Sequence, residues 1–217
     1  MATLKLGVLI SGRGTNLQAL IDRCAEQSFP AEIAVVISNR GDAAGLARAA
    51  EAGIATEVIP HGDYDGRAAF DAEVGRALER HGVGLVCLAG FMRLLGTEFV
   101  DCWRDRLINI HPSLLPAFKG LDTHARALEA GVRFTGCTVH FVRAEMDVGP
   151  ILVQAAVPVR PGDTEDTLAA RVLAAEHRAY PSAVRLIAEG RVRVVDERVE
   201  IDGARAPEPT ALNPRDD

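Results

Sequence analysis

The chain has 217 residues, 48% of them hydrophobic and 25% charged, and its 24 basic and 30 acidic side chains give a formal net charge of −6. This acidic balance argues against a nucleic-acid partner, because binding to many phosphates needs a basic surface. No apolar stretch reaches the ~18 residues of a membrane span and the amino terminus lacks a signal-peptide pattern, so we expect a cytoplasmic protein without a membrane partner.

Short runs of β-branched residues alternate with helical patterns through the first half of the sequence. Strands are predicted at 4–10, 33–38, 56–60 and 84–89, with helices at 15–26, 43–52 and 67–81 between them. This alternation is typical of a parallel sheet that carries helices on both faces. The sequence therefore predicts a doubly wound, mostly parallel α/β fold with a Rossmann-like amino-terminal half.

The second half continues with a helix, a strand and an irregular segment before two further strands and a long helix. Helices are predicted at 94–104, at 123–129 and from 163 or 164 to about 190. Strands are predicted at 107–110, 138–142 and 151–159 and as a pair within 192–201, and the irregular segment is 112–120. Pro181 is expected to kink or restart the long helix, because proline removes a backbone hydrogen bond. We expect one domain over 1–203, with lobes at 1–105 and 106–203, and a disordered tail over 204–217.

A glycine-rich loop, Ser-Gly-Arg-Gly-Thr-Asn at 11–16, follows the first strand. Doubly wound proteins bind anions at this point: Gly12 and Gly14 allow close approach of the backbone, and Thr15, Asn16 and the first helical amides donate hydrogen bonds. The loop lacks the third glycine of the dinucleotide fingerprint and the Lys-Ser/Thr of a P-loop. A phosphomonoester is the better candidate ligand, although the same residues also suit an ordinary tight turn.

Asn109 and His111 end a predicted strand, and Pro112 follows them. Side chains two residues apart in an extended chain point to the same side, so an amide and an imidazole are expected together at the edge where open α/β sheets bind ligands. Two N–H donors aimed at one point stabilise an oxyanion. The pair therefore indicates acyl transfer, although a single histidine before a proline also ends many strands for structural reasons.

A charged imidazole at His111 would need a carboxylate nearby. Asp147 is the best candidate, because the Gly-Pro pair at 149–150 predicts a constrained loop that holds its side chain inward. Asp122 and Glu145 are alternatives on the sequence alone.

Several segments together make residues 4–202 resemble the folate-dependent phosphoribosylglycinamide formyltransferase family. They lie at 10–18, 88–93, 109–116 (Asn-Ile-His-Pro-Ser-Leu-Leu-Pro), 136–142, 147–151 and 176–181. The string at 109–116 is highly specific for folate-dependent formyltransferases as a class. The resemblance implies the formyltransferase fold and transfer of the formyl group of 10-formyltetrahydrofolate to the amino group of glycinamide ribonucleotide. It also implies small-molecule substrates, no metal, no covalent enzyme intermediate, and a monomer or homodimer.

The resemblance also implies a role for individual residues. Asn109, His111 and Asp147 match the catalytic trio, which settles Asp147 over its alternatives. The implied ribonucleotide-binding residues are Gly14, Thr15, Asn16 and Glu176. The implied folate-binding residues are Arg67, Met92, Arg93, Leu94, Leu95, Asn109, Arg143 and Asp147, with backbone groups acting in the loop at 143–147. The lobe at 1–105 would hold the ribonucleotide phosphate, and the lobe at 106–203 would supply catalysis and the folate site.

Two residues depart from the family pattern, since Asp122 replaces a frequent histidine and Lys119 a frequent proline. The alternatives are a formyltetrahydrofolate deformylase, a methionyl-tRNA formyltransferase, and a non-catalytic phosphate-ligand-binding protein of the same fold. The deformylase usually carries an extra amino-terminal domain and the tRNA enzyme an extra basic carboxy-terminal domain. The short flanks of this chain therefore favour the ribonucleotide enzyme, and the presence of the complete trio argues against a non-catalytic protein.

Overall fold

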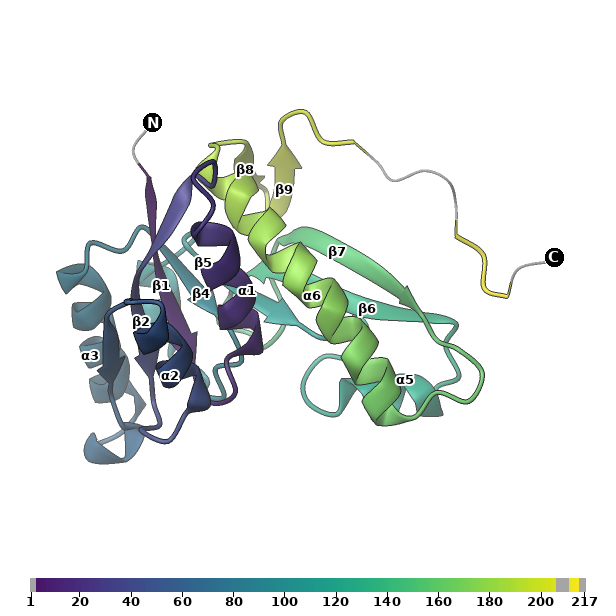
Figure 1. The fold of residues 1–217 in the computed structure, drawn as a ribbon, viewed down its shortest axis with the longest axis horizontal. Helices are drawn as coiled ribbons and strands as arrows, with labels where there is room; N and C mark the ends of the chain where they lie inside the picture. The colour runs from purple at the N-terminus through teal and green to yellow at the C-terminus, as the bar shows by residue number, and fades with distance from the viewer. Residues whose placement is uncertain (1–2, 206–210, 215–217) are drawn as a thin grey trace.

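The computed structural model describes residues 3–205 and 211–214. The strands of its central sheet are β1 (Leu4–Ile10), β2 (Ala31–Ser38), β3 (Thr56–Val58), β4 (Leu85–Leu88), β5 (Leu107–His111), β6 (Phe134–Phe141) and β7 (Ile151–Pro158). They lie in the order β3-β2-β1-β4-β5-β6-β7 (Figure 1). The pairs from β3 to β5 are parallel, whereas β6 and β7 extend the sheet in antiparallel pairs. The predicted doubly wound, mostly parallel sheet is confirmed.

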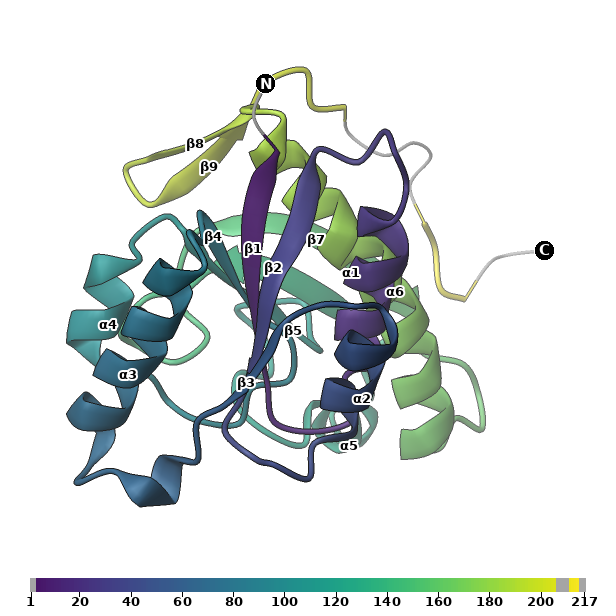
Figure 2. The ribbon, with the colours of Figure 1, turned by 60° about the vertical axis from the view of Figure 1, so that its left-hand side comes forward.

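Helices cover both faces of this sheet (Figure 2). They are α1 (Thr15–Cys24), α2 (Ala44–Glu51), α3 (Arg67–Arg80), α4 (Thr97–Cys102), α5 (Thr123–Glu129) and α6 (Glu165–Ala188), with a 3-10 turn η1 (His61–Asp63) before α3. The hairpin β8 (Val192–Val195) and β9 (Arg198–Ile201) follows α6. None of the helices within the described ranges is both long and apolar enough to cross a membrane.

The strand β1 shows why the chain buries two separate cores. Leu6 and Val8 belong to the core that includes α1 and α6, whereas Leu9 belongs to the core that includes α3 and α4. Alternate residues of a strand face opposite sides, so a strand that is apolar throughout must be covered on both faces. The nearly continuous hydrophobic run of the first strand therefore already implies the two helical layers.

Two predicted boundaries are wrong by three residues or more, and one of the two outcomes predicted at Pro181 is absent, in each case because a tertiary contact overrides a local pattern. The helix predicted at 94–104 begins only at Thr97, because extended Gly96 donates its N–H to the side chain of Asp71. The strand predicted from residue 138 begins at Phe134, which pairs with the end of β7. The helix α6 does not restart at Pro181, because the buried face of the helix continues on both sides of the proline.

The predicted disordered tail over 204–217 is only partly within the described residues, since 206–210 and 215–217 lie outside them. Asn213, which is described, donates its side-chain N–H to the carbonyl oxygens of Arg133 and Val159, at 2.5 and 3.0 Å. This part of the tail therefore contacts the chain next to the ends of β6 and β7.

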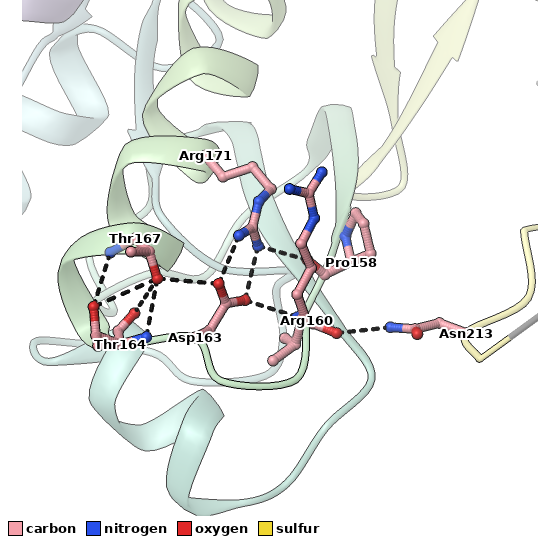
Figure 3. A network of polar contacts seen from close by, with 8 residues as sticks. Pro158, Arg160, Asp163, Thr164, Thr167, Arg171 and Asn213 are labelled. Carbon is pink, nitrogen blue, oxygen red and sulfur yellow. Dashed lines mark hydrogen bonds and ion pairs between the residues drawn. The ribbon is translucent and has the colours of Figure 1, made fainter.

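A polar network holds the beginning of α6 against the end of β7 (Figure 3). Thr164 caps the helix in a reciprocal arrangement with Thr167. Asp163 accepts hydrogen bonds from Arg171 Nη2 and Nη1 at 2.6 and 2.9 Å and from the backbone N–H of Arg160 at 2.7 Å. The side-chain hydrogen bond from Arg171 makes the largest contribution to holding the pKa of Asp163 well below its usual range. The hydrogen bond from the Arg160 N–H makes the next largest. The ionised carboxylate is therefore what stabilises this junction.

We expect Asp163→Asn to lower the melting temperature at pH 7, because the bidentate charged contact with Arg171 is lost. A carboxyl group whose pKa is lowered by folding stabilises the protein above its unfolded pKa of about 4, and this contribution is lost as the pH falls further. The difference in melting temperature between wild type and variant should therefore shrink below about pH 4. Asp166→Asn, an exposed carboxylate in the first turn of α6, is the matched control. A pH-independent difference would contradict this account.

Candidate active site

The order of the strands defines where a ligand site can form. The chain runs from β1 outward to β2 and β3, then returns to place β4 on the other side of β1. In open α/β sheets, the loops at the carboxyl ends of two such strands diverge and leave a crevice between them. The loops at 11–14, 89–96 and 112–122, which follow β1, β4 and β5, all leave this same edge of the sheet.

The loop after β1 needs its second glycine. Gly14 has φ = +70° at the N-cap of α1, and a Cβ atom there would lie 2.6 Å from Cα of Gly45. The carbonyl of Gly12 accepts the N–H of Gly45, which ties the loop to the beginning of α2. Because Gly14 has no side chain to cap α1, the N–H groups of its first turn are suited to an anionic ligand.

Asn16 and Glu176, which are 160 positions apart in the sequence, meet beside this loop. Asn16 Nδ2 donates to Glu176 Oε2 at 2.7 Å, and Glu176 on α6 is buried. Burial raises the pKa of Glu176, and the hydrogen bond from Asn16 opposes this rise. The oxygen Oδ1 of Asn16 is also buried and has no hydrogen-bond partner among the described residues. The structure thus brings together a helix N-terminus, a buried carboxyl and an unsatisfied amide oxygen.

His111 lies at the end of β5 with an acceptor facing each ring nitrogen. Its Nδ1 is 3.4 Å from Oδ1 of Asp147, and its Nε2 donates to the carbonyl oxygen of Phe118 at 3.0 Å. Asp147 is held in turn by the backbone N–H of Gly120, which lies 2.7 Å from Oδ2. A neutral imidazole has one N–H and satisfies one of these acceptors, whereas an imidazolium satisfies both. His111 is therefore positioned by acceptors on both sides of its ring.

The two sequence alternatives to Asp147 lie elsewhere. Asp122 is exposed at the N-cap of α5, and Glu145 is exposed and contacts Lys119 at 3.6 Å. The loop that carries Asp147 is constrained by Gly149, where a Cβ atom would lie 2.0 Å from the carbonyl oxygen of Phe141.

His140 completes the surroundings of Asn109. It lies opposite Asn109 in the β5–β6 register, and its Nδ1 donates to the carbonyl oxygen of Phe141 at 3.1 Å. Burial lowers the pKa of His140, so the neutral ring presents Nε2 as an acceptor 3.4 Å from Asn109 Nδ2. This contact orients the amide of Asn109. In the sequence, the alternation of His140 with Val139 and Phe141 along a strand predicts a structural or supporting role for it.

The loop between β5 and α5 is held by side chains of the antiparallel strands. Thr138 Oγ1 on β6 donates to the carbonyl oxygen of Ser113 at 2.7 Å and accepts from the N–H of Leu115 at 3.0 Å. Gln154 on β7 donates to the carbonyl oxygen of Leu115 at 3.0 Å. The peptide bond between Leu115 and Pro116 is cis. The loop that follows His111 is therefore attached to the sheet at several points.

Apart from Asn109 and Asp147, the predicted folate residues fall into two groups. Arg67, Arg93 and Leu94 line one small cavity beside α3, and Met92 next to it is 70% exposed, while Leu95 packs against the α3–α4 core. Arg143 lies apart from them: its guanidinium forms ion pairs with Asp105 and Glu197 at 2.8 and 2.6 Å. Any contact of residue 143 with a folate would therefore have to use its backbone.

A family model described as formyl transferase matches residues 4–184. The phosphoribosylglycinamide formyltransferase of Escherichia coli (strain K12) is 45% identical over 204 residues, covering 94% of this chain and 96% of that protein. The trifunctional purine biosynthetic protein adenosine-3 of Gallus gallus is 54% identical over 191 residues, or 88% of this chain. The chain spans only 19% of the length of that trifunctional relative.

Solved structures agree with these sequence relatives. Glycinamide ribonucleotide transformylase 1 from Symbiobacterium toebii is 53% identical with a TM-score of 0.90, covering 92% of this chain and 94% of that one. A formyltetrahydrofolate deformylase from Pseudomonas syringae is less similar, at 28% identity and a TM-score of 0.85, covering 92% of this chain and 66% of that one. The chain belongs to the formyl transferase family.

Proposed function

We propose that this protein transfers the formyl group of 10-formyltetrahydrofolate to the amino group of glycinamide ribonucleotide in purine biosynthesis. The observation that carries the proposal is the pairing of Asn109 and His111 at the end of β5, with the carboxylate of Asp147 at 3.4 Å from the imidazole. The names of the similar proteins from Escherichia coli and Symbiobacterium toebii support the same substrate. We further propose a cytoplasmic monomer or homodimer that acts on small molecules and needs no metal.

The ribonucleotide would bind along the loop after β1. Its phosphate fits the first turn of α1, where Gly14, Thr15 and Asn16 offer backbone and side-chain donors. Its glycinamide end fits Glu176, the buried carboxyl that already accepts a hydrogen bond from Asn16. This arrangement needs no net positive charge, so the acidic composition of the chain does not oppose it.

The chemical step follows from the donors at the end of β5. The substrate amine attacks the formyl carbon, a new C–N bond forms, and the carbonyl oxygen takes up negative charge. Asn109 Nδ2 and protonated His111 stabilise that oxygen, for which the Nε2–H of His111 exchanges the carbonyl oxygen of Phe118 for the formyl oxygen. The proton of Nε2 then passes toward the folate nitrogen as its bond to the formyl carbon breaks. Asp147 stabilises the imidazolium and accepts, through water, the proton that the attacking amine loses.

The enzyme should release tetrahydrofolate from 10-formyltetrahydrofolate only when glycinamide ribonucleotide is present. The measurement is folate release with and without the ribonucleotide. Release that does not depend on the ribonucleotide would instead identify a deformylase, and no release under either condition would identify a non-catalytic protein.

His111→Ala and Asp147→Asn should each lower kcat by roughly 100- to 1000-fold or more, the usual cost of losing an oxyanion donor or its support. His81→Ala is the matched control, because His81 lies at the end of α3 and contacts Glu57 at 2.8 Å. Circular dichroism should show the same fold in all three variants. Near-normal turnover in both site variants would contradict the proposed mechanism.

Glu176→Gln should separate stability from binding. A carboxyl group whose pKa is raised by burial destabilises the fold once the pH exceeds its unfolded value of about 4.3. The neutral amide, which still accepts from Asn16, should therefore raise the melting temperature at pH 7, with the gain vanishing at acidic pH. The KM for glycinamide ribonucleotide should rise while that for the folate stays unchanged. A lower melting temperature at pH 7 with an unchanged ribonucleotide KM would refute both parts.

A further inference from the structure

The segment at 91–95 has no regular secondary structure and lies between β4 and the extended Gly96 before α4. Four of its residues, 92–95, are among those assigned to the folate. The segment carries apolar side chains in solvent, since Met92 is 70% and Leu94 is 59% exposed. Such a segment loses conformational entropy when it binds a ligand unless other contacts already hold its shape. The question is therefore which groups hold its two ends.

The amino-terminal end of this segment is held from the loop after β1. The N–H of Met92 donates to Ser11 Oγ at 2.8 Å, and Ser11 Oγ donates onward to Asn39 Oδ1 at 2.6 Å. The N–H of Ser11 also donates to the carbonyl oxygen of Gly90. This end is therefore attached to the same loop that is assigned to the ribonucleotide.

The carboxy-terminal end is held by a single buried carboxyl. Asp71 on α3 is 5% exposed, and its Oδ2 accepts the N–H of Gly96 at 2.6 Å. Close contact at this position depends on glycine, because a Cβ atom on Gly96 would lie 3.0 Å from the same oxygen. The hydrogen bond determines both where the segment ends and where α4 begins.

Packing also connects α3 and α4, because Val74 and Phe99 belong to one hydrophobic core and Leu95 packs against it. A cavity of about 580 Å³ opens beside this packing, and Asp71, Gly96 and Phe99 are among the residues in its wall. The Asp71–Gly96 hydrogen bond crosses between the elements beside this open space. Removing it would leave Gly96 held by the N–H of Val100, which donates to its carbonyl oxygen, and by the packing of Leu95, with no hydrogen bond to α3 among the described residues.

Asp71 is a costly group for a purely structural contact. Its second oxygen, Oδ1, is buried without a hydrogen-bond partner among the described residues. Burial raises the pKa of Asp71. The hydrogen bond from the Gly96 N–H and the positive charges of Arg67 and Arg93 oppose this rise. A half-satisfied buried carboxyl calls for an explanation beyond stability. Both nearby arginines belong to the set assigned to the folate, which connects the carboxyl to that site.

We propose that Asp71 is a positioning residue for the folate: its hydrogen bond to Gly96 holds the segment at 91–95 in the shape that binds the cosubstrate. Asp71 acts through the segment and contacts no reacting atom. This inference rests on the proposed function and deepens it, because it identifies a contact from α3 that prearranges the folate side of the site in addition to the attachment to the loop after β1.

The test compares Asp71→Ala with Asp71→Asn in steady-state kinetics with both substrates. Loss of the anchor in Asp71→Ala should raise the KM for 10-formyltetrahydrofolate at least about tenfold, the scale of one hydrogen bond to a charged group, with the KM for glycinamide ribonucleotide unchanged. Asp71→Asn keeps an oxygen that accepts from Gly96 and should restore most of the folate KM. Glu79→Gln, an exposed carboxylate on the same helix and in the wall of the same cavity, is the matched control.

Three outcomes would overturn the inference: a wild-type folate KM in Asp71→Ala, an equal rise of both KM values, or an Asp71→Asn variant as impaired as Asp71→Ala. Leu94→Asp, within the segment itself, separates this failure from that of the proposed folate site. If Leu94→Asp raises the folate KM and Asp71→Ala does not, Asp71 is not a positioning residue. If Leu94→Asp leaves the folate KM unchanged, the segment does not bind the folate, and the assignment of this part of the site fails.

Discussion

Parallel pairing of β1 with β4, and of β4 with β5, is the constraint on which the rest of this protein depends. Parallel strands end at the same edge of a sheet, so the loops that follow all three strands must begin side by side at that edge. The reversal of strand order next to β1 then opens a crevice between loops that would otherwise pack together. Residues from widely separated parts of the sequence reach one place for this reason alone.

The antiparallel addition of β6 and β7 gives this common scaffold its specific chemistry. It places His140 opposite Asn109 and Thr138 opposite His111, so that a neutral ring orients the amide and a hydroxyl anchors the loop beyond the imidazole. The loop that joins β6 to β7 carries Asp147. A sheet that ended at β5 would expose Asn109 and His111 without the groups that contact and orient them.

Two buried carboxyl groups, Glu176 and Asp71, each have one principal hydrogen-bond donor, Asn16 and the N–H of Gly96. Asp147 is less buried and lies between the N–H of Gly120 and the imidazole of His111. Burial of a carboxylate with so few donors costs stability, in contrast to Asp163, whose several donors keep it ionised for structural support. The two buried carboxyls with a single principal donor lie where the ligands are proposed to bind, and Asp163, with several donors, lies at the junction of β7 and α6.

The sequence by itself determined the order of helices and strands, the two-sided burial of the first strand, and the choice of Asn109 and His111 as a pair. These features follow from local periodicity and from the alternation of side chains along a strand. Only the tertiary structure decided that α4 begins after Gly96, that α6 continues through Pro181, and that His140 orients Asn109. It also decided that Asn16 meets Glu176 and that the Arg143 side chain is occupied by ion pairs. Each of these depends on a contact between distant segments, whose energy outweighs local propensity and leaves no periodic trace in the sequence.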